Sequence, residues 1–314
     1  MSNQTLVTEF LLQGFSDIRE IQILHFVVFL VLYLGALLGN LLILLIITAI
    51  ALDHHLHTPM FFFLVNLSIL DLGSISVTVP KSMANSLLNT RSISYPACVT
   101  QFFLFLVFIS TDLALLTVMA YDRYVAICQP LHYEQVMNRG ACVQMATSAW
   151  IAGIINSALH TANIFRLPFC QSKDIDQFFC EIPPLLKLAC SDSDLSELGL
   201  LTFSVFLFLN CFVLIIVSYV QIFKAVMRIP SEQGRHKAFS TCLPHLAVVS
   251  LLLCTGFFEY LKPASSSTSI LDLLVGVLYA VVPPMMNPVI YSMRNKEIKA
   301  ALKKLIVWSK FIKN

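Results

Sequence analysis

The sequence predicts an all-α membrane protein: a bundle of seven transmembrane helices followed by a short amphipathic C-terminal helix. Of the 314 residues, 57% are hydrophobic and only 12% are charged, and the mean hydropathy is +0.80, far outside the balance of an ordinary soluble domain. Apolar stretches long enough to cross a bilayer also recur along the chain. They cover Leu24 to Ile50, Pro59 to Val79, Phe102 to Cys128, Cys142 to Ala162, Leu198 to Phe223, Ala238 to Leu261 and Leu271 to Tyr291.

The basic residues orient this bundle. An odd number of spans places the two termini on opposite sides of the membrane. Most of the 20 lysines and arginines fall on the side that holds Arg123, Arg235 and the C-terminal tail, which the positive-inside rule assigns to the cytoplasm. We therefore expect one domain in the plasma membrane, without a cleavable signal peptide. Its parts are an extracellular N-terminus over 1–23, the bundle over 24–293 and a cytoplasmic tail over 294–314.

The first two spans carry polar residues that need partners. Asn3 opens an Asn-Gln-Thr acceptor on the predicted lumenal side, so we expect glycosylation there. Gly39 and Asn40 interrupt the first span, and an amide at that depth requires a partner on another helix. Asp71 in the second span is costly in hydrocarbon unless it faces the bundle interior.

The third span has one distinctive face. Asp112 lies 11 residues before Arg123, close to three full turns, so both side chains fall on the same side of the helix. Lipid would reject such a face, which must turn toward the other helices. It also carries Phe102, Phe105, Leu106, Ile109, Leu116 and Met119.

Four cysteines lie on the predicted oxidising side. Cys98 stands at the outer start of the third span, and Cys170, Cys180 and Cys190 lie in the longest lumenal loop. An even number on this side indicates two disulfides, for which the residues alone allow three pairings.

Four strings resemble those of odorant receptors, a branch of the rhodopsin-like G-protein-coupled receptors. They are MAYDRYVAIC at Met119–Cys128, LHTPMF at Leu56–Phe61, KAFSTC at Lys237–Cys242 and PMMNPVIY at Pro284–Tyr291. The resemblance covers nearly the whole chain. It departs from the family pattern at Phe61, where a tyrosine is usual, and in the sixth span, which lacks an FYG-like string.

The resemblance implies a receptor that binds a volatile odorant and activates a stimulatory G protein, raising cAMP. It favours disulfides Cys98–Cys180 and Cys170–Cys190. It also implies a proline hinge in the seventh span and a resting ion pair at the cytoplasmic end of the third. The implied switch residues are Asp122, Arg123, Tyr124, Tyr219, Asn287, Pro288 and Tyr291.

The ligand is expected to be small and mostly apolar, bound in the outer half of the bundle. Val281 occupies the place where opsins carry the retinal lysine, and Phe105 the place where amine receptors carry an aspartate. Retinal and biogenic amines are thereby excluded as ligands by these contacts. The candidate ligand residues are Phe102, Phe105, Leu106, Ile109, Ser110, Phe203, Ser204, Leu207, Phe257 and Tyr260.

Asp71 and Asp112 are expected to approach one another near Asn40 and Asn287, a set able to hold a sodium ion. His245 is either a satisfied interior histidine or a partner of Asp112. No other cofactor is expected.

The chain shows no nucleotide, hydrolase or metalloprotease motif, so an enzyme is not expected, and neither is a nucleic-acid partner. The alternative is an ion-coupled transporter or channel that uses Asp71 and Asp112.

Residues 296–312 place Ile298 and Leu302 on one face and most lysines on the other, which predicts a helix lying on the inner leaflet.

Overall fold

The computed structural model describes residues 8–52, 59–169, 173–189, 195–261, 270–294 and 298. Several predictions fall outside this part of the chain. They are the glycosylation of Asn3, the Cys170–Cys190 disulfide, the helix over 296–312 and the side chain of Tyr260.

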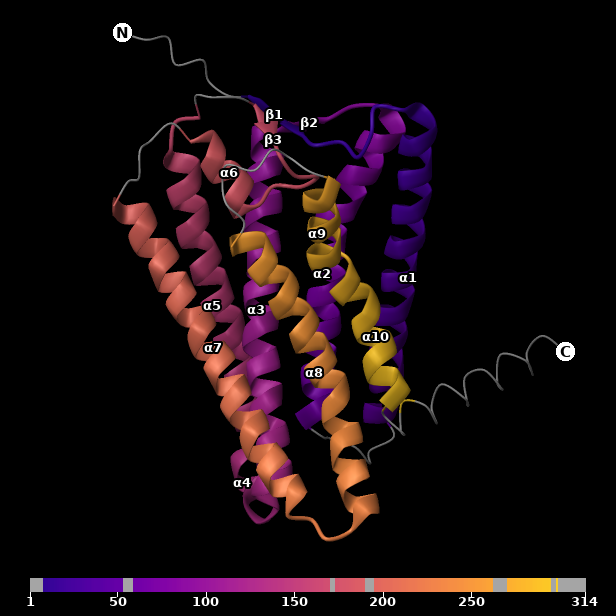
Figure 1. Cartoon of the computed structure of the whole chain (residues 1–314), viewed down its shortest axis with the longest axis vertical. Helices are drawn as coiled ribbons and strands as arrows, with labels where there is room; N and C mark the ends of the chain where they lie inside the picture. The colour runs from indigo at the N-terminus through magenta and orange to yellow at the C-terminus, as the bar shows by residue number, and fades with distance from the viewer. Residues whose placement is uncertain are drawn as a thin grey trace, which may run out of the picture.

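Seven helices in the described part are long and apolar enough to cross a membrane, as the sequence predicts. Figure 1 shows them side by side in one bundle. Six spans are single helices, and the seventh combines two shorter ones. In chain order they are α1 (Arg19–Leu52), α2 (Pro59–Leu88), α3 (Tyr95–Cys128), α5 (Arg139–Arg166), α7 (Leu195–Met227), α8 (Glu232–Leu261), and α9 (Ile270–Ala280) with α10 (Val282–Arg294).

The helices extend beyond the apolar stretches because their ends have their own stop and start residues. Pro96 occupies the first turn of α3, where its missing N–H costs no hydrogen bond. Asn138 caps α5, since its side-chain oxygen accepts from the Ala141 N–H at 2.9 Å. Both helices therefore begin several residues before their apolar stretches.

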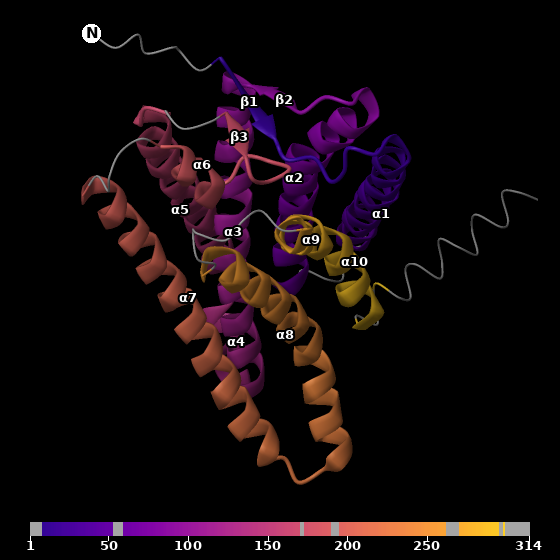
Figure 2. The same cartoon turned by 45° about the horizontal axis from the view of Figure 1, so that its top comes forward.

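Helix α3 lies at the centre of the bundle and contacts α2, α5, α7 and α8. Figures 1 and 2 show α7 and α8 diverging from their shared turn at the lower end. That end also carries a 3-10 turn, η1 (Pro130–His132), and α4 (Tyr133–Val136). A side chain on the inner faces of α3 therefore meets partners from several helices.

A small sheet closes the opposite end, a feature that the sequence did not predict. Its strands are β1 (Glu9–Leu12), β2 (Ser92–Ser94) and β3 (Asp174–Ile175), in the order β2-β1-β3. β1 runs antiparallel to β2 and parallel to β3. The N-terminal segment therefore links the α2–α3 connection to the loop after α5.

The loop after α5 is fixed to the bundle by a disulfide. Cys180 is joined to Cys98 near the start of α3, which confirms the predicted pairing. A short helix, α6 (Ile182–Leu188), follows. Phe178 and Phe179, just before the bridge, are at most 1% exposed, so this loop enters the bundle as a plug.

The seventh span breaks between α9 and α10, as its prolines predict. Pro283 and Pro284 lack the N–H that would continue the helix. Asn40 on α1 donates to the Pro284 carbonyl at 2.9 Å, so the predicted interhelical partner of this amide is confirmed. A Cβ at Gly39 would come within 3.1 Å of the Pro288 ring, so α1 and α10 pack at close range.

Candidate functional site

The polar centre of the bundle joins α2 to α10. Asn287 donates to both carboxylate oxygens of Asp71, at 3.0 and 3.1 Å. Both residues are nearly fully buried, and Asn40 lies close by through its bond to Pro284. The predicted association of Asp71 with Asn287 is therefore confirmed.

Asp71 and Asp112 line one small cavity together with Ser74, Phe108 and Tyr279. Its volume of about 10 Å³ is close to the roughly 10–15 Å³ that one water molecule needs. The Oδ1 atom of Asp112 is buried and has no hydrogen-bond partner in the described part of the chain. Within that part, no group of three or more His, Cys, Asp or Glu side chains could hold a metal. A sodium ion here remains a prediction.

Of the two alternatives for His245, the satisfied interior histidine is confirmed, and the pairing with Asp112 is wrong. Its Nδ1 atom lies 2.8 Å from the Tyr219 hydroxyl, and its Nε2 atom lies 2.9 Å from the Leu116 carbonyl oxygen. Leu116 is one turn beyond Asp112 on α3, so the backbone takes the place that the carboxylate was expected to fill. Both ring nitrogens are satisfied, and His245 ties α8 to α3 and α7.

The Asp122–Arg123 pair lies at the α4 end of α3. Nε of Arg123 is 3.9 Å from Oδ2 of Asp122, a long ion pair, whereas the Tyr133 hydroxyl donates to Oδ1 of the same carboxylate at 2.8 Å. Burial, and then the negative charge of Asp122, raise the pKa of the Tyr133 phenol well above its ordinary value. Tyr133 therefore stays protonated as a hydrogen-bond donor.

Tyr133 was not among the residues predicted for this site. Its signal was its position in the turn directly after the MAYDRYVAIC string, within reach of a buried carboxylate. Two other predicted switch residues are also in contact with the protein. The Tyr124 hydroxyl accepts from Gln129 at 3.2 Å, and Tyr291 is buried, at 7% exposed.

The candidate ligand residues of α3 divide between two neighbourhoods. Phe105 contacts Phe179 of the plug and Tyr279 of α9, with ring centroids 4.8 and 5.8 Å away. Phe102 instead packs on Phe165 of α5, at 5.5 Å, and Leu106 belongs to that same cluster near α6. Ile109 borders both clusters.

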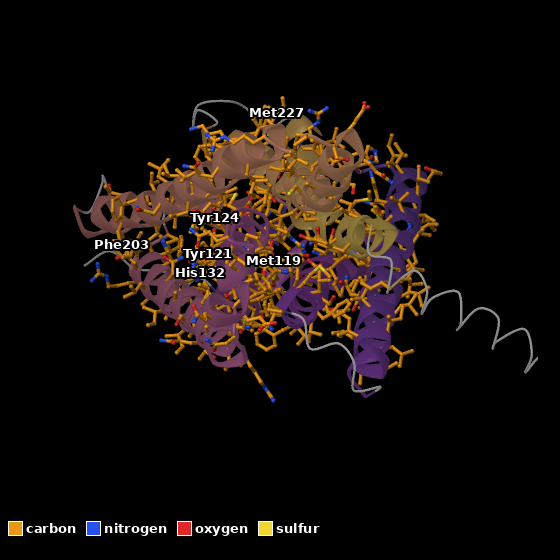
Figure 3. The ribbon with its side chains drawn as sticks, turned by 90° about the horizontal axis from the view of Figure 1, so that it is seen from below. Met119, Tyr121, Tyr124, His132, Phe203 and Met227 are labelled. Atoms are coloured by element: carbon orange, nitrogen blue, oxygen red, sulfur yellow. A yellow bond between two sulfur atoms is a disulfide. The ribbon has the colours of Figure 1, made fainter. Side chains whose placement is uncertain are left out.

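Helix α7 is rotated relative to the sequence prediction. Phe203 and Leu207 are 49% and 40% exposed, on the outer face that would meet lipid, and Figure 3 shows Phe203 at the edge of the bundle. Phe208 faces inward, and its ring lies 5.2 Å from that of Phe257 on α8. The assignment of Phe203 and Leu207 to the interior is therefore corrected.

Comparison with known proteins agrees with this architecture. A family model described as olfactory receptor matches residues 29–309. The human olfactory receptors 14A16 and 14I1 are each 54% identical to the chain, over 98% of it and 98% of their own lengths. The chain belongs to the olfactory receptor family. The crystal structure of squid rhodopsin shares the fold, with a TM-score of 0.69 at 14% identity, over 92% of this chain and 82% of that one.

This olfactory receptor is a multi-pass plasma-membrane protein of the G-protein-coupled class and not an enzyme. Full-length similarity to olfactory receptors, with no transporter among these relatives, does not favour the transporter or channel alternative.

In this receptor a polar network connects Ser110 and Ser204, the two serines among the candidate ligand residues. The Ser204 hydroxyl donates to Asn156 at 3.1 Å and lies 2.6 Å from Nε2 of His160, and Asn156 donates to Ser110 at 3.3 Å. Asn156 and His160 were not among the predicted site residues. Their four-residue spacing places both on one face of α5, which was the available signal.

Proposed function

We propose that this olfactory receptor binds a small, mostly apolar volatile molecule between α3, α7, α8 and α9, beneath the plug. The contact of Phe105 with Phe179 and Tyr279 carries this proposal, because it forms an aromatic wall directly above the Asp112 cavity. Phe208 replaces Phe203 and Leu207 in the proposed set. The other members are Phe102, Phe105, Leu106, Ile109, Ser110, Ser204, Phe257 and Tyr260.

The composition of this wall sets the expected affinity. Apolar contact contributes roughly 25 cal/mol per Å² buried, and a small odorant buries little surface. Ser110 and Ser204 are the chief groups that could hydrogen-bond to the ligand. Both already form hydrogen bonds within the Asn156–His160 network. We therefore expect weak binding, on the order of micromolar, and broad tuning.

Two adjacent residues of α7 test the position of the ligand. A cAMP reporter screen of volatile compounds would first supply an agonist. Phe208→Ala should then raise the half-maximal agonist concentration, because it removes an inward ring, whereas Leu207→Ala should leave it unchanged at equal surface level. A potency change in Leu207→Ala alone would place the site outside the bundle.

The cytoplasmic partner proposed here is a stimulatory G protein, engaged at the α4 end of α3, α7 and α8. The distribution of lysine and arginine supports a cytoplasmic location for this end, with the N-terminus outside. Arg123 is held beside Asp122 at rest and is freed when α8 moves away from α3. Arg123→Ala at normal surface level should abolish odorant-driven cAMP, and a preserved response would contradict this role.

We further propose that Asp71, Asp112 and Asn287 hold a sodium ion in the resting state. The buried, unpartnered Oδ1 of Asp112 supports this, because an isolated buried carboxylate is costly without a cation or a proton. Replacing sodium with N-methylglucamine should increase agonist potency in the wild type but not in Asp112→Asn. Equal potency in both salts for the wild-type receptor would contradict the sodium site.

A further inference from the structure

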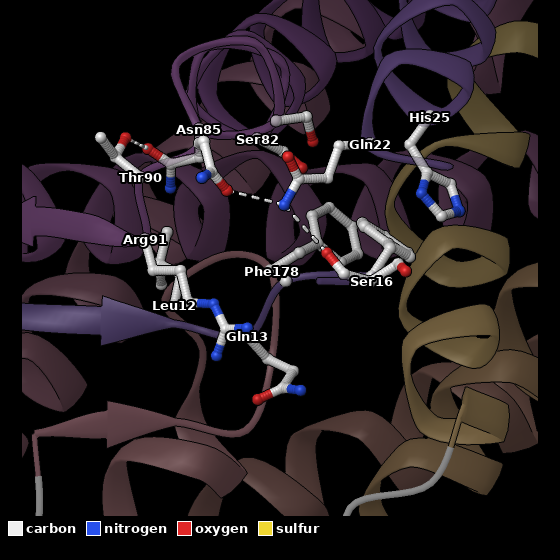
Figure 4. Close-up of a pocket in the computed structure, with 14 residues that line it drawn as sticks. Leu12, Gln13, Ser16, Gln22, His25, Ser82, Asn85, Thr90, Arg91 and Phe178 are labelled. Carbon is white, nitrogen blue, oxygen red and sulfur yellow. Dashed lines mark hydrogen bonds between the residues drawn. The ribbon is translucent and has the colours of Figure 1, made fainter. Parts of the chain in front are cut away.

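A second, larger cavity lies at the sheet end of the molecule, apart from the proposed odorant site. It is enclosed by the chain after β1, the start of α1, the end of α2 and Phe178 of the plug (Figure 4). Its volume is about 60 Å³, which at roughly 10–15 Å³ per water molecule corresponds to about four to six non-hydrogen atoms. The cavity therefore fits a very small molecule.

The walls of this cavity are rich in hydrogen-bond donors. Arg91 lines it with a guanidinium group that has five N–H donors, and one terminal nitrogen also pairs with Asp17. The Asn85 side-chain oxygen accepts from Thr90 at 3.4 Å, which leaves its NH₂ group as a possible donor to a ligand. Ser82, which is 4% exposed, adds a hydroxyl.

No carboxylate lines the cavity within the described residues. Gln22 fixes one wall, since its amide donates both to the Ser16 carbonyl at 3.1 Å and to Asn89 at 2.8 Å. Arg91 has N–H donors beyond the one that pairs with Asp17, and the Asn85 amide and the Ser82 hydroxyl add further donors. These donors favour a ligand with acceptor oxygens, and the planar guanidinium favours a carboxylate among such ligands.

An aromatic chain connects this cavity to the proposed odorant site. Phe178 forms the inner wall, and its ring lies 4.8 Å from Phe179. Phe179 lies 4.8 Å from Phe105. A molecule in the cavity would therefore contact Phe178. It would favour the position of the plug in which Phe179 packs on Phe105.

We propose that this cavity is a second binding site, specific for a small carboxylate, whose occupation lowers the potency of odorants. The binding does not depend on the proposed odorant site, whereas the effect on potency does.

Acetate is the probe, with neutral acetamide as its isosteric control. In thermal unfolding of the purified receptor, sodium acetate should raise the melting temperature, while equal concentrations of acetamide or sodium chloride should not. Arg91→Gln removes the cation and should abolish the shift. Lys173→Gln, which removes an exposed charge outside the cavity, should retain it.

A cavity-filling variant provides the second arm. Ser82→Leu should abolish the acetate shift by occupying the space while leaving Arg91 in place. In cells, acetate should raise the half-maximal odorant concentration of the wild type by roughly five-fold, at the lower end of typical coupling between sites, and leave that of Ser82→Leu unchanged.

Each outcome decides a separate claim. Absence of an acetate-specific shift in the wild-type receptor would overturn the binding site, even if neither variant could be purified. A shift that persists in both Arg91→Gln and Ser82→Leu would place acetate elsewhere and overturn it too. Stabilisation without any change in odorant potency would refute the coupling alone. If no odorant raised cAMP through this receptor, the proposed function would be refuted. The acetate-dependent melting temperature would still test the binding site.

Discussion

Tyr133 and Asp122 form a short side-chain contact at the α4 end of α3. The phenol donates at 2.8 Å, whereas the neighbouring guanidinium approaches only to 3.9 Å. Hydrogen bonds to charged groups contribute more than neutral ones, so Tyr133 is expected to hold Asp122 in place more firmly than Arg123 does.

Tyr133→Phe should therefore weaken the resting state. Losing this bond costs roughly 1.5–3 kcal/mol, which corresponds to about ten-fold or more in the balance between resting and active forms. We expect higher basal cAMP at equal surface level. Tyr121→Phe is the matched control, because Tyr121 is 41% exposed on the outer side of α3. Equal basal signals in the two variants would show that Tyr133 does not stabilise the resting state.

Helices α3 and α5 meet at a position where only glycine fits. A Cβ at Gly153 would overlap Oγ1 of Thr111 and come within 3.1 Å of the Val107 carbonyl oxygen. A Cβ at Gly35 on α1, by contrast, would have no atom within 4 Å. Both glycines lie inside helices, and they differ in the space that is available to a side chain.

Substitution by alanine should have opposite effects at these two sites. Gly35→Ala should stabilise the receptor by roughly 0.5–1 kcal/mol, because alanine favours the helix. Gly153→Ala should destabilise it by about 1–3 kcal/mol through overpacking against backbone. The melting temperatures of the purified variants check both signs. Stabilisation in Gly153→Ala would mean that α3 and α5 can separate without cost.

The helices show which features the sequence could predict. Each span was visible from its apolar length, and Asn287 was correctly placed near Asp71 because an intramembrane carboxylate needs partners in the bundle interior. The inner face of α7 was assigned wrongly, because a helix that is apolar all round has no polar side to mark its orientation. The packing of Phe208 on Phe257 and the exposure of Phe203 reveal it.

Contacts that depend on loop conformation were beyond the sequence. The plug places Phe179 on Phe105, and no periodic pattern in the loop indicates that two phenylalanines enter the bundle. The sequence left two alternatives open for His245 for a related reason: a backbone carbonyl oxygen is one of its partners, and a sequence pattern does not show which carbonyl oxygens can accept.

At the scale of the whole molecule, the Cys98–Cys180 bridge holds the plug over the bundle. Cys98→Ser or Cys180→Ser should each cost roughly 2–5 kcal/mol and strongly reduce the amount of receptor at the cell surface. The double variant should lose no more than either single one. Cys254→Ser, which changes an exposed free cysteine, should reach the surface normally. A double variant much worse than both singles would contradict the pairing.

The sheet imposes an order on biosynthesis. Residues of β1 leave the ribosome among the first, yet Leu11 pairs with Asp174, roughly 160 residues later. At about 5–20 residues per second, this strand waits on the order of 8–30 seconds for its parallel partner. Through that interval at least one edge of β1 is unpaired and able to join other strands. The pairing of β1 is thus completed only when more than half of the 314 residues have been made.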